Sequence, residues 1–136
     1  MPRLICIDYG SKRCGIAVTD PLQIIVQGLE TVSTPDLFDY IRNYVQKEQI
    51  EKMFVGMPIH KDGTETYLAA DIRKFVTKFN ADYPEIPVIE IDEQFTSVRA
   101  KSILIEGGVK KKDRRDKAEI DKVSAVIMLQ QYLGHI

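Results

Sequence analysis

The chain has 136 residues, of which 44% are hydrophobic and 29% are charged, a composition typical of one globular domain with a buried core. We therefore expect a single domain over residues 1–136. The formal net charge of −1 excludes a surface that is basic throughout, so contact with nucleic acid requires a local basic patch. No apolar run is long enough to span a membrane and no signal-peptide pattern follows Met1, so we expect a cytoplasmic protein.

Three strands are predicted at the start of the chain, over residues 3–8, 14–20 and 24–32. The first is a short apolar run of the kind that is buried on both faces of a sheet, and Pro21 ends the second. Residues 10–13 are expected to form the turn between them. Because the connections are short, we expect the three strands to pair as an antiparallel meander.

A helix is predicted next, with Thr34 as its N-cap and Pro35 at its first helical position. A buried strand over residues 52–57, a second helix over about 64–80 and a strand over 88–92 follow. The inward residues expected on the second helix are Leu68, Ile72, Phe75, Val76 and Phe79.

The last third of the chain predicts two more helices. One begins at Thr96 or Ser97 and ends at the glycines 107–108, and the other spans about residues 118–133. A charged segment, residues 109–117, lies between them. Strands alternating with helices that cross between them predict an α/β domain built around a mixed sheet.

Both cysteines, Cys6 and Cys14, lie in apolar segments that are predicted to be strands. The sequence has no CxxC pair and no Cys/His cluster, which argues against a zinc site. We expect two buried thiols in a reducing compartment.

Three acidic residues stand where burial would favour an apolar side chain. Asp8 ends the first strand, Glu93 follows the last strand, and Asp121 lies on the expected inward stripe of the final helix. A buried carboxylate is costly unless it is paired or binds a cation. Together the three would form an oxygen-rich site for Mg²⁺ or Mn²⁺, the kind of site that hydrolyses phosphodiesters. Taken singly, each also has a plain structural interpretation, as a turn cap, a solvated loop residue or a favourable charge at a helix N-terminus.

Basic residues are concentrated in two places near these carboxylates. A cationic segment beside an acidic metal site suits a phosphate backbone, although charge runs are often only solvated loops. The residues we expect to contact nucleic acid are Lys12, Arg13, Lys110, Lys111, Lys112, Arg114, Arg115 and Lys117.

Other polar residues carry weaker signals. Asp20, before Pro21, is interpreted as a turn residue, and Thr64 as an ordinary helix cap in preference to a phosphate site. His60 and His135 support no catalytic arrangement, and the chain has no Walker-type phosphate loop.

Four motifs in order along the chain resemble the YqgF/RuvX family, relatives of the Holliday-junction resolvase RuvC. The resemblance covers nearly the whole chain. Its residues are Asp8-Tyr9-Gly10 with 15–20, then 55–58 through 62–64, then 92–97, and finally 121–125 through 129–130.

The resemblance implies a ribonuclease-H-like fold, in which helices flank a mixed five-stranded sheet. It also implies a cytoplasmic, metal-dependent nuclease that matures the 5′ end of pre-16S ribosomal RNA with one or two Mg²⁺ or Mn²⁺ ions. Asp8, Glu93 and Asp121 fall on the family's acidic site. Gln94 stands where the family usually has an arginine, which removes a phosphate contact. His60 and Ser124 are smaller departures.

Three other functions stay open at this point. A Holliday junction resolvase acting on branched DNA would use the same chemistry but needs two active sites, so monomer and homodimer are both retained. A non-catalytic factor that binds RNA or the ribosome would keep the fold alone. Nucleotide binding of the actin/Hsp70 kind is disfavoured, because those ATPases use two copies of the fold and 136 residues supply one.

Overall fold

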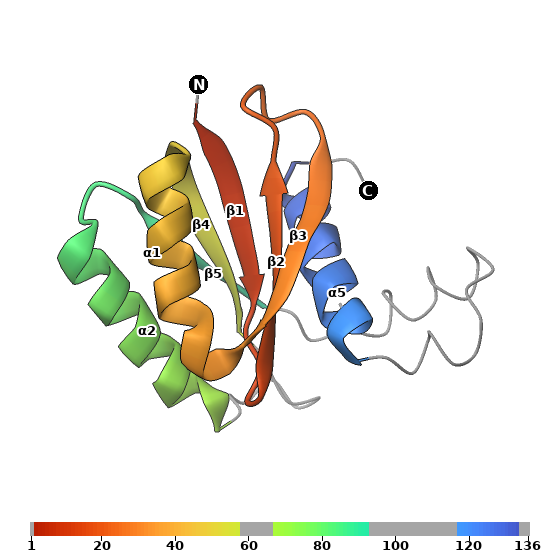
Figure 1. Cartoon of the computed structure of the whole chain (residues 1–136). Coiled ribbons are helices and arrows are strands. Elements are labelled where there is room, and N and C mark those ends of the chain that lie inside the picture. The colour runs from red at the N-terminus through yellow and green to blue at the C-terminus, as the bar shows by residue number, and fades with distance from the viewer. Residues whose placement is uncertain (1, 58–66, 93–116, 134–136) are drawn as a thin grey trace.

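The computed structural model describes residues 2–57, 67–92 and 117–133, without the side chains of residues 92 and 117–121. A five-stranded sheet lies between two helices on one face and a third helix on the other (Figure 1). In chain order the elements are β1 (Arg3–Asp8), β2 (Arg13–Thr19), β3 (Val26–Ser33), η1 (Thr34–Asp36), α1 (Leu37–Lys47), β4 (Ile50–Met57), α2 (Leu68–Asp82), β5 (Val88–Asp92) and α5 (Lys117–Tyr132).

The strand order is β3-β2-β1-β4-β5. The first three strands form the predicted antiparallel meander, and β4 and β5 continue the sheet in parallel with β1. The predicted mixed five-stranded sheet is therefore confirmed. The carboxyl ends of β1, β4 and β5 lie at one edge of the sheet, which we call the carboxyl edge (Figure 1).

The two-residue period of β1 divides the core between the two faces of the sheet. Ile5 and Ile7 pack with residues of α1 and α2, such as Ile41 and Ile72. The alternate residues of β1 pack on the opposite face, against α5. A strand that is buried on both faces has no polar side, which is why its sequence is one continuous apolar run.

The helices follow the predicted inward residues closely. On α2, Leu68, Ile72, Phe75 and Phe79 are buried, and Val76 is half-buried. On α5, Ala125 and Met128 are buried as expected, but Tyr132 is 48% exposed and packs its ring on Phe54 with the centroids 4.3 Å apart. Ser124 is also buried, and its hydroxyl finds no hydrogen-bond partner among the described residues.

Two local predictions need correction, and two more fall outside the described residues. Thr34 is not the N-cap of an α-helix, because residues 34–36 form a 3-10 turn and the α-helix begins at Leu37. Arg13 belongs to β2 rather than to the preceding turn. The predicted start of the second helix at Thr64 and the helix over residues 96–107 lie outside the described residues.

Cys6 and Cys14 are both buried and are not joined by a disulfide, as predicted. Cys6 packs in the cluster on the α5 face, whereas Cys14 packs in the cluster on the α1/α2 face. Because the sheet lies between them, the two thiols serve as small core side chains on separate faces. None of the described helices is long and apolar enough to cross a membrane.

Candidate active site

Asp8 is the last residue of β1, at the carboxyl edge, and only 7% of it is exposed. Its side chain belongs to the α5 face, because the alternate residues Leu4 and Cys6 pack in the cluster on that face. On the neighbouring strands, Gly15 of β2 and Gly56 of β4 lie directly opposite Asp8. A buried carboxylate is thus flanked on both neighbouring strands by residues without side chains.

The turn that follows Asp8 is tied to the end of β3. The Thr34 hydroxyl donates a hydrogen bond to the Gly10 carbonyl oxygen at 2.7 Å, and the Thr34 amide donates to the Lys12 carbonyl at 3.0 Å. A Cβ atom on Gly10 would overlap the Arg13 carbonyl oxygen. Only glycine therefore fits this turn as it is closed here, which fixes the path of the chain just after Asp8.

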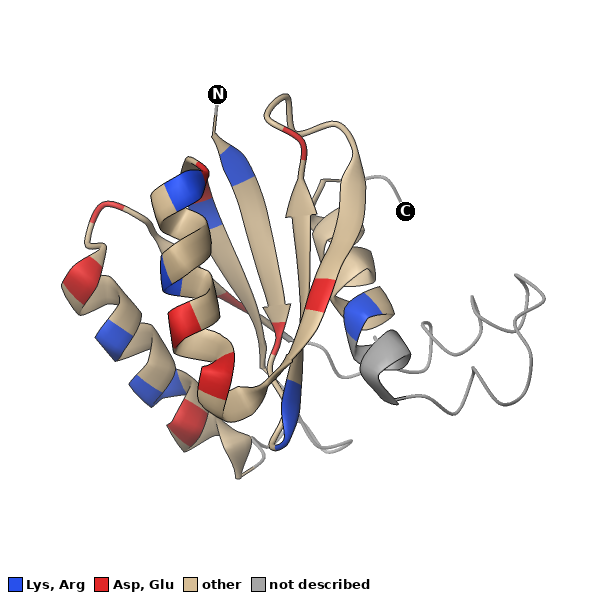
Figure 2. Cartoon of the chain, in the orientation of Figure 1, with Lys and Arg blue, Asp and Glu red and all other residues tan. Residues whose placement is uncertain are grey.

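Lys12 and Arg13, two of the predicted nucleic-acid contacts, lie on this same turn and at the start of β2. Lys12 is exposed and Arg13 is half-buried. Figure 2 shows basic residues at the base of β2, at the carboxyl edge. Both residues follow Asp8 closely along the chain, between the end of β1 and the start of β2.

Three helices begin at the carboxyl edge. The N-termini of α1, α2 and α5 all lie there, whereas the helices end toward the opposite edge of the sheet (Figure 1). The N-terminus of a helix carries partial positive charge and unpaired backbone N–H groups. This edge therefore combines a buried carboxylate with an environment that favours anions such as phosphates.

The backbone of Asp121 lies in α5, one helical turn before Ala125. Ala125 belongs to the same buried cluster as Cys6, which precedes Asp8 by two residues on β1. Because α5 begins at the carboxyl edge, the backbone of position 121 lies toward that edge, on the same face of the sheet as Asp8. The side chain of Asp121 is not among those described.

The remaining predicted site residues lie outside the described part of the chain. These are Glu93, Lys110, Lys111, Lys112, Arg114 and Arg115, together with the side chain of Lys117 at the start of α5. Within the described residues, no group of three His, Cys, Asp or Glu side chains forms a metal site. Of the three predicted metal ligands, only the Asp8 side chain falls in that part of the chain.

The packing of Tyr9 on the other face of the sheet was not predicted from the sequence. This half-buried residue packs on the α1/α2 face, opposite Asp8, with its ring 6.2 Å from that of Phe75. Burial, together with Cys14 and Asp71, raises the pKa of its hydroxyl. Its alternation with Asp8 was visible in the sequence, but its partners on α1 and α2 were not.

The model of the RuvX family, described as a Holliday junction resolvase, matches residues 2–135. The chain belongs to the RuvX family. A relative from Phocaeicola vulgatus is 49% identical over 98% of this chain and 96% of its own length, and one from Porphyromonas gingivalis is 47% identical over 99% and 98%. Both carry the name "Putative pre-16S rRNA nuclease". The RuvX chain is accordingly a hydrolase that acts on nucleic acids.

Two solved structures confirm the fold of this RuvX chain. RuvC from T. thermophilus, in complex with a Holliday junction substrate, matches with a TM-score of 0.58 at 15% identity over 98% of this chain and 97% of its own. The fowlpox virus Holliday junction resolvase matches with a TM-score of 0.56 at 11% identity over 98% and 99%. At such identities the likeness shows the fold alone, and that fold is the predicted ribonuclease-H-like one.

Proposed function

We propose that this nuclease hydrolyses RNA phosphodiesters with the help of Mg²⁺ or Mn²⁺, and that its substrate is the 5′ end of pre-16S ribosomal RNA in the cytoplasm. The catalytic carboxylates are Asp8, Glu93 and Asp121. In this proposal residues 1–136 form one nuclease domain that binds structured RNA.

The observation that carries the proposal is the surroundings of Asp8. Its carboxylate is buried at the carboxyl edge, and the residues beside it on both neighbouring strands, Gly15 and Gly56, are glycines on the same face. A carboxylate that served only packing would gain from larger neighbours, because apolar contacts stabilise a core. In this proposal the two glycines would let a cation and a phosphate approach the carboxylate.

The residues present suit a divalent cation, since Mg²⁺ and Mn²⁺ favour carboxylate oxygens. Asp8 would hold the ion with Asp121, whose backbone lies in the first part of α5 on the same face of the sheet, and with Glu93. Ile91, near the described end of β5, packs on the same α5 face as Asp8. A bound ion supplies Lewis-acid stabilisation of the reacting phosphate and a more acidic water.

The basic residues have a separate role in this mechanism. Lys12 and Arg13, at the turn after Asp8, bind the backbone phosphates beside the scissile bond and keep the strand in register with the carboxylates. The charged segment that carries Lys110, Lys111 and Lys112, and also Arg114, Arg115 and Lys117, holds the flanking backbone. Phosphate contacts of this kind position the substrate without reading its sequence, and they weaken as salt rises.

RNA is favoured as the substrate because relatives that are 44–49% identical over nearly the whole chain are named for pre-16S rRNA. Cleavage of branched DNA is the second candidate, because the description of the family model is a Holliday junction resolvase. That reaction would need two active sites, and hence a homodimer, whereas cleavage of a single RNA strand needs only a monomer.

The test is to incubate the protein, in parallel, with a structured pre-16S rRNA fragment and with a four-way DNA junction, each with Mg²⁺ and with EDTA. We expect Mg²⁺-dependent cleavage of the RNA near the mature 5′ end. Glu93→Gln and Asp121→Asn should each abolish that cleavage. Cleavage of the junction alone would replace the first candidate by the second. Salt-sensitive RNA binding with no cleavage of either substrate would leave only a binding factor.

A further inference from the structure

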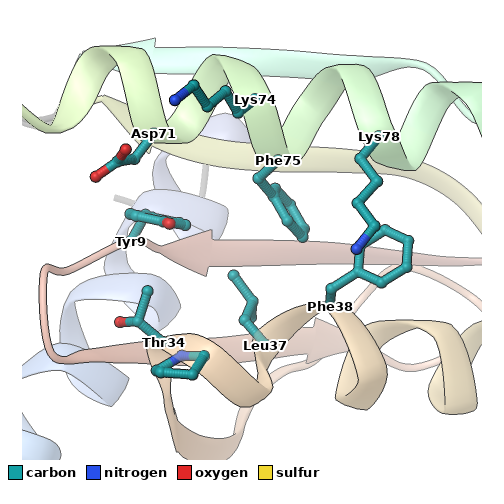
Figure 3. A pocket seen from close by; sticks show the side chains of 9 residues that line it. Tyr9, Thr34, Leu37, Phe38, Asp71, Lys74, Phe75 and Lys78 are labelled. Carbon is teal, nitrogen blue, oxygen red and sulfur yellow. The ribbon is translucent and has the colours of Figure 1, made fainter.

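A pocket of about 270 Å³ lies on the face of the sheet opposite Asp8, between the start of α1 and the first turns of α2 (Figure 3). Its position depends on three separate parts of the chain that meet near the carboxyl edge. The residues that line it are Tyr9, Thr34, Pro35, Leu37, Phe38, Asp71, Lys74, Phe75 and Lys78.

Aromatic rings form the apolar wall of this pocket. The Tyr9 and Phe75 rings are 6.2 Å apart, and the Phe38 and Phe75 rings meet edge to face at 6.3 Å. Phe75 is buried, whereas Tyr9 and Phe38 are half-buried and retain exposed surface. Such a wall offers flat apolar faces to a planar ligand.

Two lysines stand at the rim, one turn apart on α2. Lys74 and Lys78 are both exposed, and the Lys78 ammonium lies 4.0 Å from the centre of the Phe38 ring (Figure 3). This contact is a cation–π pair at the surface, which a competing anion readily displaces. An anion that drew Lys78 away would uncover the face of the Phe38 ring. The acidic rim residue, Asp71, lies on the Tyr9 side of the pocket, away from Lys78.

The pocket and the proposed active site are joined by consecutive residues. Asp8 belongs to the α5 face, and Tyr9 lines the pocket on the α1/α2 face. The exposed Lys12 lies on the turn that connects the two sides at the carboxyl edge. A nucleic-acid strand that passes Asp8 and crosses this turn would therefore reach the pocket.

We propose that this pocket binds one unstacked nucleotide of the substrate strand, next to the scissile bond, with its base against the Tyr9 and Phe38 rings and its phosphate between Lys74 and Lys78. The inference rests on the proposed nuclease function and names how the substrate strand is held. Aromatic stacking accepts any base, so this contact would hold the strand without selecting its sequence. The pocket lies below the usual range for drug-sized ligands, which limits the occupant to a single nucleotide.

The test measures binding separately from cleavage. Anisotropy of a short fluorescein-labelled single-stranded RNA gives Kd in EDTA, where no Mg²⁺-dependent cleavage occurs. Lys74→Glu and Lys78→Glu are each compared with Lys47→Glu, an equal charge change in the last turn of α1 at the far edge of the sheet. All three lysines are exposed, and thermal melting checks that each variant folds. We expect Kd to rise about tenfold for each pocket variant and less than about twofold for Lys47→Glu.

A second comparison tests the base contact. The wild-type protein should bind the intact oligonucleotide more tightly than one with an abasic position, and Phe38→Leu should reduce that difference while it keeps an apolar side chain. Equal Kd values for all three lysine variants would overturn the inference and leave the pocket to another kind of partner. Cleavage of RNA by the wild-type protein, assayed in parallel with Mg²⁺, keeps the two proposals apart. If cleavage is present and the lysine variants bind alike, only the pocket assignment fails.

Discussion

Asp8 and Asp20 occupy similar places in the sequence, because one lies before β2 and the other just after it, each at the start of a turn. Their surroundings differ completely. The Asp20 carboxylate accepts hydrogen bonds from the backbone N–H groups of Leu22, Ile24 and Ile25, at 3.3, 2.7 and 2.7 Å. Asp8 is buried between two glycines, and the turn after it is closed from outside by Thr34.

The comparison sets an aspartate that serves structure at one end of β2 against one for which we propose a chemical role at the other. The turn at Asp20 uses the carboxylate to satisfy its own backbone, including the turn around Gln23, which has a positive φ of 58°. These backbone hydrogen bonds, with that from Ile25 the largest, lower the pKa of the Asp20 carboxyl. The turn at Asp8 is tied by a residue 24 positions away from Gly10, and the carboxylate before it is buried beside Gly15 and Gly56.

The largest expected effect is that of Asp8→Asn. The amide keeps the shape of the side chain but removes the charge that a divalent cation requires, so cleavage should fall by at least about 10³-fold. Asp20→Asn, the matched control, should leave cleavage unchanged. Single-turnover rates on a precursor rRNA fragment with Mg²⁺ measure both variants. Loss of activity in both, or in neither, would remove the distinction between the two aspartates.

Gly10→Ala should have an intermediate effect. Its Cβ would overlap the Arg13 carbonyl oxygen, so the backbone of the turn must move, at a cost of about 1–3 kcal/mol in the free energy of unfolding. Displacement of the residues beside Asp8 should lower the cleavage rate by about ten- to a hundredfold.

Gly28→Ala is the control for Gly10→Ala. There the added Cβ meets the Lys122 side chain, 2.8 Å from Cγ and 3.0 Å from Cδ, and this flexible stem can shift where a backbone carbonyl cannot. Urea unfolding and cleavage rates compare the two variants. A larger loss of stability and cleavage in Gly28→Ala than in Gly10→Ala would contradict this account, because the turn after Asp8 would then accept a Cβ atom more easily than position 28 does.

The smallest effect is expected from Asp20→Asn on stability, and it should depend on pH. Because the folded state lowers the pKa of the Asp20 carboxyl below its ordinary value of 3.8, ionised Asp20 stabilises the fold at neutral pH. That contribution is fully present above the ordinary pKa and is lost as pH falls through the lowered one. Wild type should therefore be more stable than Asp20→Asn at pH 7, and their melting temperatures should converge in acid. A constant difference at all pH values would contradict this account.

Much of the fold was predictable because the strands are apolar runs with clear ends. β1 has the predicted boundaries, and so does β5. Local sequence patterns gave a wrong prediction where a residue's hydrogen-bond partner is distant in the sequence. Thr34 before Pro35 is typical of a helix N-cap, yet its hydroxyl donates to Gly10 at the far end of the meander. No local pattern could show that contact, since the pairing of β2 with β3 creates it.

The position of Asp8 was predictable from the apolar run that it ends, whereas its neighbours from distant parts of the chain were not. Asp8 interrupts an apolar run, so its burial and position at a strand end follow from the sequence. The glycines beside it could not be assigned from the sequence alone, because Gly15 and Gly56 become neighbours of Asp8 only through the register of two strands. The pocket beyond Tyr9 was missed altogether, since its walls come from the turn after β1, from η1 and α1, and from α2.

The central claim, that Asp8 holds a divalent metal ion, is tested most directly by binding of Mn²⁺ without any substrate. Electron paramagnetic resonance of the free aqueous ion measures how much Mn²⁺ each protein removes from solution. We predict that wild type and Asp20→Asn bind Mn²⁺ alike and that Asp8→Asn binds it at least about tenfold more weakly. Equal binding by Asp8→Asn and wild type would contradict the account.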